Sequence, residues 1–131
     1  MSYSQANMMQ YLDATDTDFG AGIGTPWSFK GPNGKQGQLR NIGIHVKETF
    51  ACDTTTGKVQ IGTAADPDAY GSLEIADGTL NTDTFNNVDD TDCVISQALA
   101  ADTQIEVTFV QCADSVSPAG KGRAYVEVDW Y

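Results

Sequence analysis

The chain has 131 residues, with 18 Asp and Glu against 7 Lys and Arg, so its formal net charge is -11. This length fits a single domain. Nucleic-acid binding is disfavoured, because phosphate neutralisation needs clustered cations and the few cations here are scattered along the chain. The acidity instead favours solubility, a basic partner or divalent cations.

The inventory of large apolar residues is small. Leu, Ile, Val and Phe together make up 26 of the 131 residues. At this net charge such a composition lies near that of disordered chains, but the alternating segments described below argue for a folded one. A thin core also suggests that further apolar surface is buried against a partner.

The N-terminal stretch is the first candidate element. Residues Ser4 to Asp13 are expected to form a short helix with Ser4 as its N-cap and with Met8 and Leu12 on one side. The polar, Gly-rich stretch DATDTDFGAGIGTP that follows indicates a loop or an extended arm. We therefore divide the chain into an N-terminal arm, residues 1–26, and a β-domain, residues 27–131.

This start has neither the basic region nor the apolar region of a signal peptide, so none is expected. No apolar run approaches the roughly 18 residues of a membrane span, and we expect no membrane partner.

The rest of the chain alternates between apolar and polar residues. In the clearest segment Ile42, Ile44 and Val46 share one face. Only the stretch 94–101 hints at another helix, and no helix of ten or more residues separates any two strands, which excludes βαβ units. The pattern predicts an all-β fold, an antiparallel β-sandwich of jelly-roll type. The expected strands are 26–31, 39–50, 58–62, 72–76, 103–112 and 120–131.

The closing strand places Val126, Val128 and Trp130 toward a core, with Tyr125 and Tyr131 on the opposite face. A tyrosine at an interface packs its ring and keeps its hydroxyl bonded, whereas in water the apolar ring is wasted. The N-terminal stretch carries a second apolar group without an obvious core. We therefore expect a homo-oligomer, a trimer, whose interface includes Met8, Met9, Tyr11, Leu12, Tyr125 and Tyr131.

The sequence lacks the motifs, or the flanking elements, that catalytic and cofactor-binding sites require. The Gly-rich run from Gly20 to Gly24 has neither the preceding strand nor the following helix of a dinucleotide site. His45 is the one histidine, and the chain has no Gly-x-Ser-x-Gly or Cys-x-x-Cys motif. We expect no catalytic residue, no metal site, no cofactor and no enzymatic activity.

Aspartates cluster within residues 13–18 and within the acidic loop 77–92. Neither cluster fits an EF-hand, so a solvated loop is the simpler interpretation, with calcium at the second cluster as an alternative. Some aromatic residues are able to stack a sugar, although core and interface roles are commoner: Trp27, Tyr70, Trp130 and Tyr131.

The cysteines are Cys52, Cys93 and Cys112, an odd number, so at least one stays unpaired within the chain. Free thiols without a signal peptide indicate synthesis in a reducing cytoplasm. We expect reduced thiols without an intrachain disulfide, with Cys52 and Cys112 buried as small hydrophobes.

Two stretches carry a family resemblance: the hairpin GIHVKETFACDTTTGKVQIG and the closing SPAGKGRAYVEVDWY. Together with the short acidic chain, they resemble head-decoration or cement proteins, small virion proteins of tailed bacteriophages. The resemblance implies a jelly-roll-like, often trimeric subunit, made in the host cytoplasm, that binds the assembled capsid and stabilises it. Its partner would be the major capsid protein or another virion protein. A carbohydrate-binding jelly-roll module of a phage fibre is the alternative.

Overall fold

The structure is a computed structural model, and it describes residues 7–22, 24–80, 83–90, 93 and 98–131. Within these ranges every regular element is a strand, so the described chain holds no helix that would cross a membrane. The strands are β1 (Asn7–Leu12), β2 (Thr17–Asp18), β3 (Trp27–Phe29), β4 (Gly37–Ala51), β5 (Gly57–Gly62), β6 (Gly71–Ile75), β7 (Thr84–Asn86), β8 (Ala98–Leu99), β9 (Ile105–Val110) and β10 (Ala119–Trp130).

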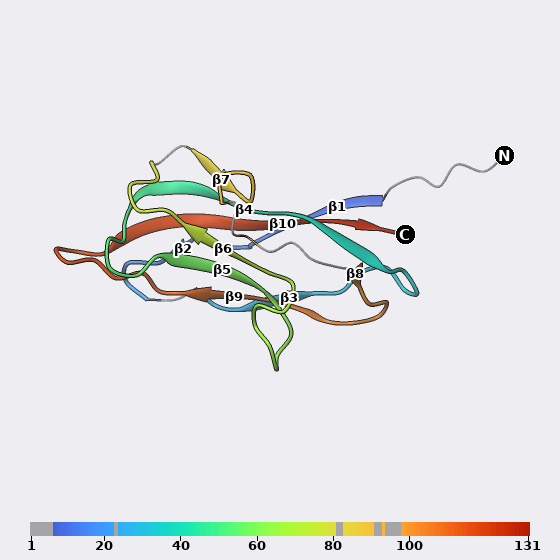
Figure 1. Cartoon of the computed structure of the whole chain (residues 1–131). Helices are drawn as coiled ribbons and strands as arrows, with labels where there is room; N and C mark the ends of the chain where they lie inside the picture. Colours follow the sequence, from blue (N-terminus) through green and yellow to red (C-terminus); the bar gives the residue numbers. More distant parts are fainter. Residues whose placement is uncertain (1–6, 23, 81–82, 91–92, 94–97) are drawn as a thin grey trace.

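The strands form two layers, which confirms the predicted antiparallel β-sandwich (Figure 1). One sheet has the order β1-β10-β4-β7, with β2 also pairing with β10 and β8 with β4. The other sheet has the order β3-β9-β5-β6. Strands β4 and β10 form the long central pair of the first sheet, with register shifts near residues 119–122 and 127–128.

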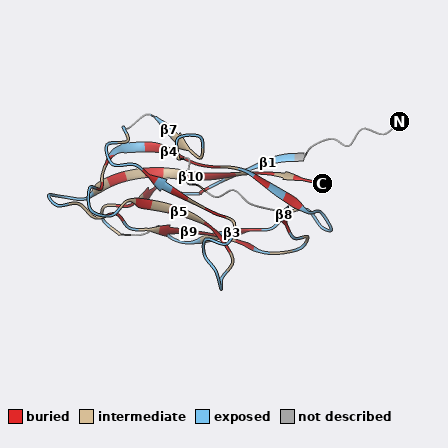
Figure 2. Ribbon diagram, viewed as in Figure 1, coloured by how far each residue is buried: buried red, intermediate tan, exposed pale blue. Residues whose placement is uncertain are grey.

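The core lies between the sheets and follows the alternation of the sequence. Figure 2 shows buried positions recurring along β4, β5, β9 and β10. Ile42, Ile44 and Val46 are buried as predicted, because every second residue of a strand points to the same face. The predicted inward residues of the other strands are buried too: Val59, Ile61, Leu73, Ile75, Ile105, Val107, Phe109, Val126, Val128 and Trp130.

The N-terminal segment is a strand, so the predicted short helix is wrong over the described residues. β1 pairs antiparallel with β10, with Met9 opposite Val128 and Tyr11 opposite Val126. β2 pairs with β10 as well, and Phe19, which follows it, is fully buried in the core. Pairing with β10 outweighs the local helix signal, since intrinsic propensity is a weak prior. Residues 7–22 are therefore part of the sandwich and not a separate arm.

Two short strands lie in regions where the sequence predicted none. β7 lies within the acidic loop 77–92 and pairs with β4, with Phe85 opposite Ile44. The helix expected over 94–101 is not found in its described part, where β8 pairs with the start of β4. Residues 94–97 lie outside the described residues.

Trp130 anchors the closing strand in a slot that only glycine permits. A Cβ atom at Gly31 or Gly37 would lie 2.5 or 2.6 Å from the Trp130 ring, closer than real contacts allow. The indole Nε1 donates a hydrogen bond of 3.0 Å to the Tyr11 hydroxyl oxygen. The slot ties the last strand to β1 and to the loop that precedes β4.

Candidate functional site

The first candidate is the free side of β1, where the first sheet ends. Met8, Met9 and Leu12 are 52%, 42% and 48% exposed. The strand reads NMMQYL and carries no charged residue. Edge strands are usually protected by charge, proline or a bulge, because their unpaired N–H and C=O groups can pair with another chain. We call this strand, with its three exposed apolar side chains, the β1 edge.

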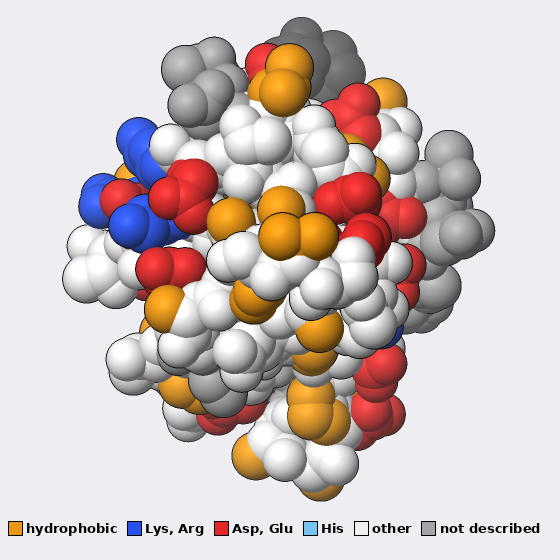
Figure 3. Space-filling model, turned by 90° about the vertical axis from the view of Figure 1, so that its left-hand side faces the viewer, with side chains coloured by type: hydrophobic (Ala, Val, Ile, Leu, Met, Phe, Trp, Pro, Cys, Tyr) orange, Lys and Arg blue, Asp and Glu red, His pale blue; other side chains and the backbone are white. Residues whose placement is uncertain are grey.

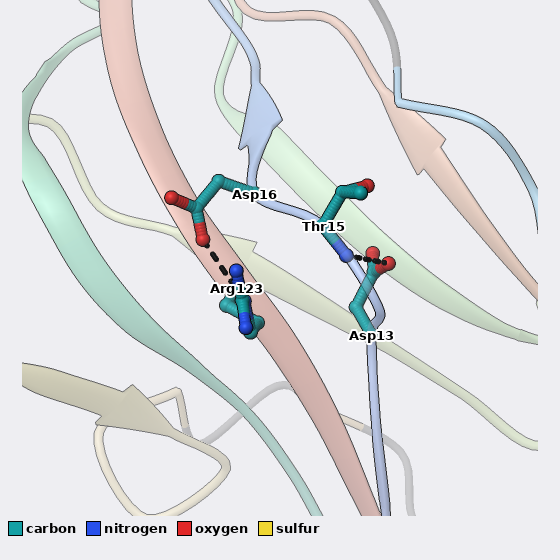
Figure 4. Close-up of polar contacts among 4 residues, drawn as sticks. All are labelled: Asp13, Thr15, Asp16 and Arg123. Atoms are coloured by element: carbon teal, nitrogen blue, oxygen red, sulfur yellow. Dashed lines mark hydrogen bonds and ion pairs between the residues drawn. The ribbon is translucent and has the colours of Figure 1, made fainter.

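A groove continues the β1 edge toward the start of β3. Its volume is about 390 Å³, and it is lined by Leu12, Asp13, Ala14, Thr15, Thr25, Pro26 and Trp27. Asp13 is 6% exposed and accepts the N–H of Thr15 at 3.1 Å (Figure 4). The Trp27 ring lies 6.1 Å from that of Phe29, and its buried Nε1 has no partner among the described residues. The groove therefore combines apolar walls with a buried carboxylate and an indole.

Tyr11, a predicted interface residue, is half-buried, with its ring packed against the core. Its ring stacks on Phe29, with centroids 4.1 Å apart and an interplanar angle of 17°. Its hydroxyl oxygen accepts the Trp130 hydrogen bond. Tyr11 thus joins the β1 edge to the core.

Tyr125 and Tyr131 are placed differently from each other. Tyr125 is 4% exposed, stacks on His45 at 4.8 Å and covers Gly43, where a Cβ atom would lie 2.3 Å from the tyrosine ring. Burial raises the pKa of Tyr125, and the chain itself already covers this ring. Tyr131 is exposed, and it follows Trp130, which is paired with Asn7 at the start of β1. The structure therefore brings Tyr131, but not the Tyr125 ring, to the surface beside the β1 edge.

Acidic side chains beside the β1 edge are held by partners. Asp129 lies 3.2 Å from Arg40, and Glu127 accepts a hydrogen bond of 2.8 Å from the Asn41 amide. Figure 4 shows a third such contact, in which Arg123 of β10 reaches Asp16 of the β1–β2 connection at 3.0 Å. The two ion pairs reduce the local charge next to an apolar edge, whereas the Glu127 carboxylate is held by a neutral amide and keeps its charge.

The aspartate clusters act as backbone acceptors. Asp18 accepts the N–H groups of Gly20 and Ala21, and Asp90 accepts that of Glu74 at 2.7 Å. Among the described residues no group of three or more His, Cys, Asp and Glu side chains is arranged to hold a metal ion. Asp92, in the second cluster, lies outside the described residues. The described aspartates therefore fasten loops.

His45 lies on the outer face of β4. Its Nδ1 is 3.2 Å from the Thr84 hydroxyl of β7, and its ring stacks on Tyr125. These contacts attach the short strand β7 to the long central strands. They give the single histidine of the chain a structural role.

The opposite end of the sandwich has a different surface. Figure 3 looks at this end, the left of Figure 1, which includes the β9–β10 connection. Apolar side chains in this view stand apart between acidic and polar ones, and the Lys and Arg side chains gather on one side. Val116 of that connection is 92% exposed but is a single residue, which needs no partner to explain it.

The sequence matches no protein-family model and no curated protein. The β1 edge and its groove are therefore the features that bear on function. The sequence pattern indicates Met8, Met9 and Leu12 as interface residues but predicts a helix for them. The groove has no signal in the sequence, because its walls come from two segments that are brought together only in the fold.

Proposed function

We propose that this protein is a structural subunit that assembles through the β1 edge, and that it serves as a decoration protein bound to a phage head. The observation that carries the proposal is an uncharged edge strand with three exposed apolar side chains beside an apolar groove. Such an edge is an aggregation hazard unless a partner covers it. A subunit that functions only in an assembly gains an interface from the same feature.

The β1 edge and the groove are two different patches, and together they suit a ring of three copies. Closed rings need a heterologous contact, in which two different patches of neighbouring subunits meet. Met8, on the face of β1 opposite to Met9 and Tyr11, forms one patch, and the groove beside Trp27 forms another. Methionine suits this role, because its flexible and polarizable side chain adapts to irregular apolar surfaces.

The connectivity supports a jelly-roll interpretation. If β1 with β2 and β7 with β8 are each taken as one interrupted strand, eight strands form two four-stranded sheets. The chain crosses from one sheet to the other at every step except β5 to β6. Double-sheet jelly rolls with two Greek keys occur in viral capsid proteins and in lectins.

The assembly is tested by light scattering after gel filtration. We expect the wild type to elute with about three times the 14.0 kDa mass of one chain. Met8→Glu and Leu12→Glu should give monomers that remain folded by circular dichroism, because both side chains are exposed on the single subunit. Val116→Glu is the matched control at the other end of the molecule. A monomeric wild type, or edge variants that remain trimeric, would contradict the proposal.

The decoration role needs a second measurement. Wild-type protein should co-sediment with expanded phage heads that lack it and should raise the temperature at which they open. Met8→Glu should lose this binding, and Val116→Glu should keep it. A trimer that binds no head would retain the assembly proposal and refute the decoration role.

The groove also supports a second candidate, carbohydrate binding. An aromatic ring next to a fixed carboxylate suits a sugar, which stacks on the ring and donates hydroxyl hydrogen bonds to the oxygens. Trp27 and Asp13 lie together in the lining of the groove. A glycan array followed by titration of Trp27 fluorescence tests this function. Binding abolished by Trp27→Ala, in a variant that still assembles, would favour the sugar over the capsid.

A further inference from the structure

Two buried cysteines meet where the sheets come together at one end of the sandwich. Cys52 directly follows β4 of the first sheet, and Cys112 lies two residues beyond β9 of the second. Both side chains are buried, and both thiols are free in the structure. The proposed assembly uses neither residue.

Their sulfur atoms share one acceptor. The Cys52 Sγ lies 3.5 Å from the carbonyl oxygen of Ala119, and the Cys112 Sγ lies 3.7 Å from the same oxygen. The Cys112 Sγ also lies 3.9 Å from the carbonyl oxygen of Ala51, the neighbour of Cys52 in the chain. The two thiols are therefore neighbours across the core.

The backbone on either side of this pair is already fixed. Thr55 and Ala113 exchange two hydrogen bonds, of 2.9 and 3.1 Å, just beyond the two cysteines. Asp53 accepts the N–H of Ser115 at 2.7 Å, which adds a second tie between the same two loops. A covalent link at Cys52 and Cys112 would thus join segments that the fold already holds together, so little rearrangement is needed.

We propose that Cys52 and Cys112 form an intrachain disulfide when the chain folds in the presence of a disulfide oxidant such as oxidised glutathione. One cysteine thiolate attacks the oxidant and releases one glutathione thiol. The second cysteine thiolate then displaces the other glutathione, so the protein gains one S–S bond and loses two S–H bonds. The oxidant takes up the two electrons and leaves as two thiols.

Cys93 is the alternative partner, and its position argues against it. It is half-buried, and it interacts with Asp90 and with the backbone of Ser72. By contrast, the sulfur atoms of Cys52 and Cys112 lie against the same carbonyl oxygen, that of Ala119. We therefore expect the link at this pair among the three that the cysteines allow.

A disulfide that forms only with an added oxidant is compatible with the expectation that the chain is synthesised with reduced thiols in a cytoplasm. Burial and the neighbouring Cys112 thiol raise the pKa of Cys52 to about 12, so its thiolate is scarce near neutral pH. Because the thiolate is the attacking species, the folded protein should oxidise slowly and a refolding chain readily.

The test is refolding of the denatured full chain in a glutathione redox buffer. Intact-mass measurement should show a loss of about 2 Da, and non-reducing peptide mapping should show the Cys52–Cys112 link. The link closes a long loop and should raise the melting temperature by on the order of 10 °C, a gain that dithiothreitol reverses.

Three variants make the result specific. Cys93→Ala should form the link with the same yield, whereas Cys52→Ala and Cys112→Ala should refold without any intrachain link. Circular dichroism verifies that each variant folds. A wild type that folds but gains no disulfide, a link that involves Cys93, or a link that lowers the melting temperature would each overturn the inference.

Discussion

Aspartate side chains hold loops in place along the described chain by accepting hydrogen bonds from backbone N–H groups. Asp77 accepts the N–H of Cys52 at 2.7 Å, and Asp102 accepts that of Gly34 at 3.0 Å. A carboxylate with a backbone donor is a strong, charge-assisted hydrogen bond that holds a turn in one conformation. The acidity that first suggested cations or basic partners has, at the residue scale, a structural use.

Asp53 gives this role a measurable pH dependence. Hydrogen bonds donated by the hydroxyl and the N–H of Ser115, and then by the Thr54 hydroxyl, lower the pKa of Asp53 below its ordinary value of 3.8. A carboxyl group whose pKa is lower in the folded state adds stability above its unfolded pKa, and this stability is lost as pH falls through the folded pKa. We expect Asp53→Asn to melt below the wild type at pH 6, with the difference shrinking as the pH falls through and below the ordinary Asp pKa of 3.8. A difference that is constant with pH would contradict this role.

The hydrogen bond from Trp130 to Tyr11 gives a second prediction at this scale. Tyr11→Phe removes the acceptor and leaves the buried indole N–H without its partner, while the stacking on Phe29 is kept. We expect a loss of about 1–3 kcal/mol in the free energy of unfolding, measured in urea. Tyr131→Phe, at an exposed position, is the matched control and should change stability by less than about 0.5 kcal/mol.

At the scale of elements, the N-terminal segment contributes to the core although the sequence pattern indicates a separate arm. Its strands β1 and β2 both pair with β10. Phe19, which follows β2, then packs in the core against Phe50 and Phe109, with ring centroids 5.4 and 5.9 Å away. The segment therefore stabilises the subunit as well as presenting the β1 edge. Truncation of residues 1–20 would remove both contributions together.

A single substitution separates the contribution of this segment to the core from its role in presenting the β1 edge. Phe19→Ala leaves the β1 edge in place and should cost about 3–5 kcal/mol in the free energy of unfolding, because it empties a fully buried site. Leu80→Ala, at a large exposed residue, is the control and should cost little. If the two variants unfold at the same denaturant concentration, the segment does not belong to the core.

At the scale of the whole molecule, a charge of -11 opposes association while an apolar edge favours it. Three ion pairs are formed among the described residues, and two of them lie beside the β1 edge, at Arg40–Asp129 and Arg123–Asp16. Association through this edge thus has to overcome repulsion between the rest of the subunit surfaces.

Salt should therefore strengthen the assembly. Raising the ionic strength from about 0.05 to 0.5 M screens the repulsion between acidic subunits but leaves the apolar contact intact. Sedimentation equilibrium should show tighter association at the higher ionic strength. Weaker association would indicate that ionic contacts hold the subunits together, and the β1 edge would then not be the interface.

The sequence alone determined the sandwich, because alternation is a local property. Ile42 to Val46 and Val126 to Trp130 show which residues point inward without reference to any other part of the chain. The formation of β1 and the burial of Tyr125 depend on residues that are far away in the sequence. β1 exists because β10 supplies its hydrogen bonds, and Tyr125 is buried because Gly43 lacks a side chain. The meeting of Cys52 with Cys112 has the same origin, since only the stacking of the two sheets brings together residues so far apart in the sequence.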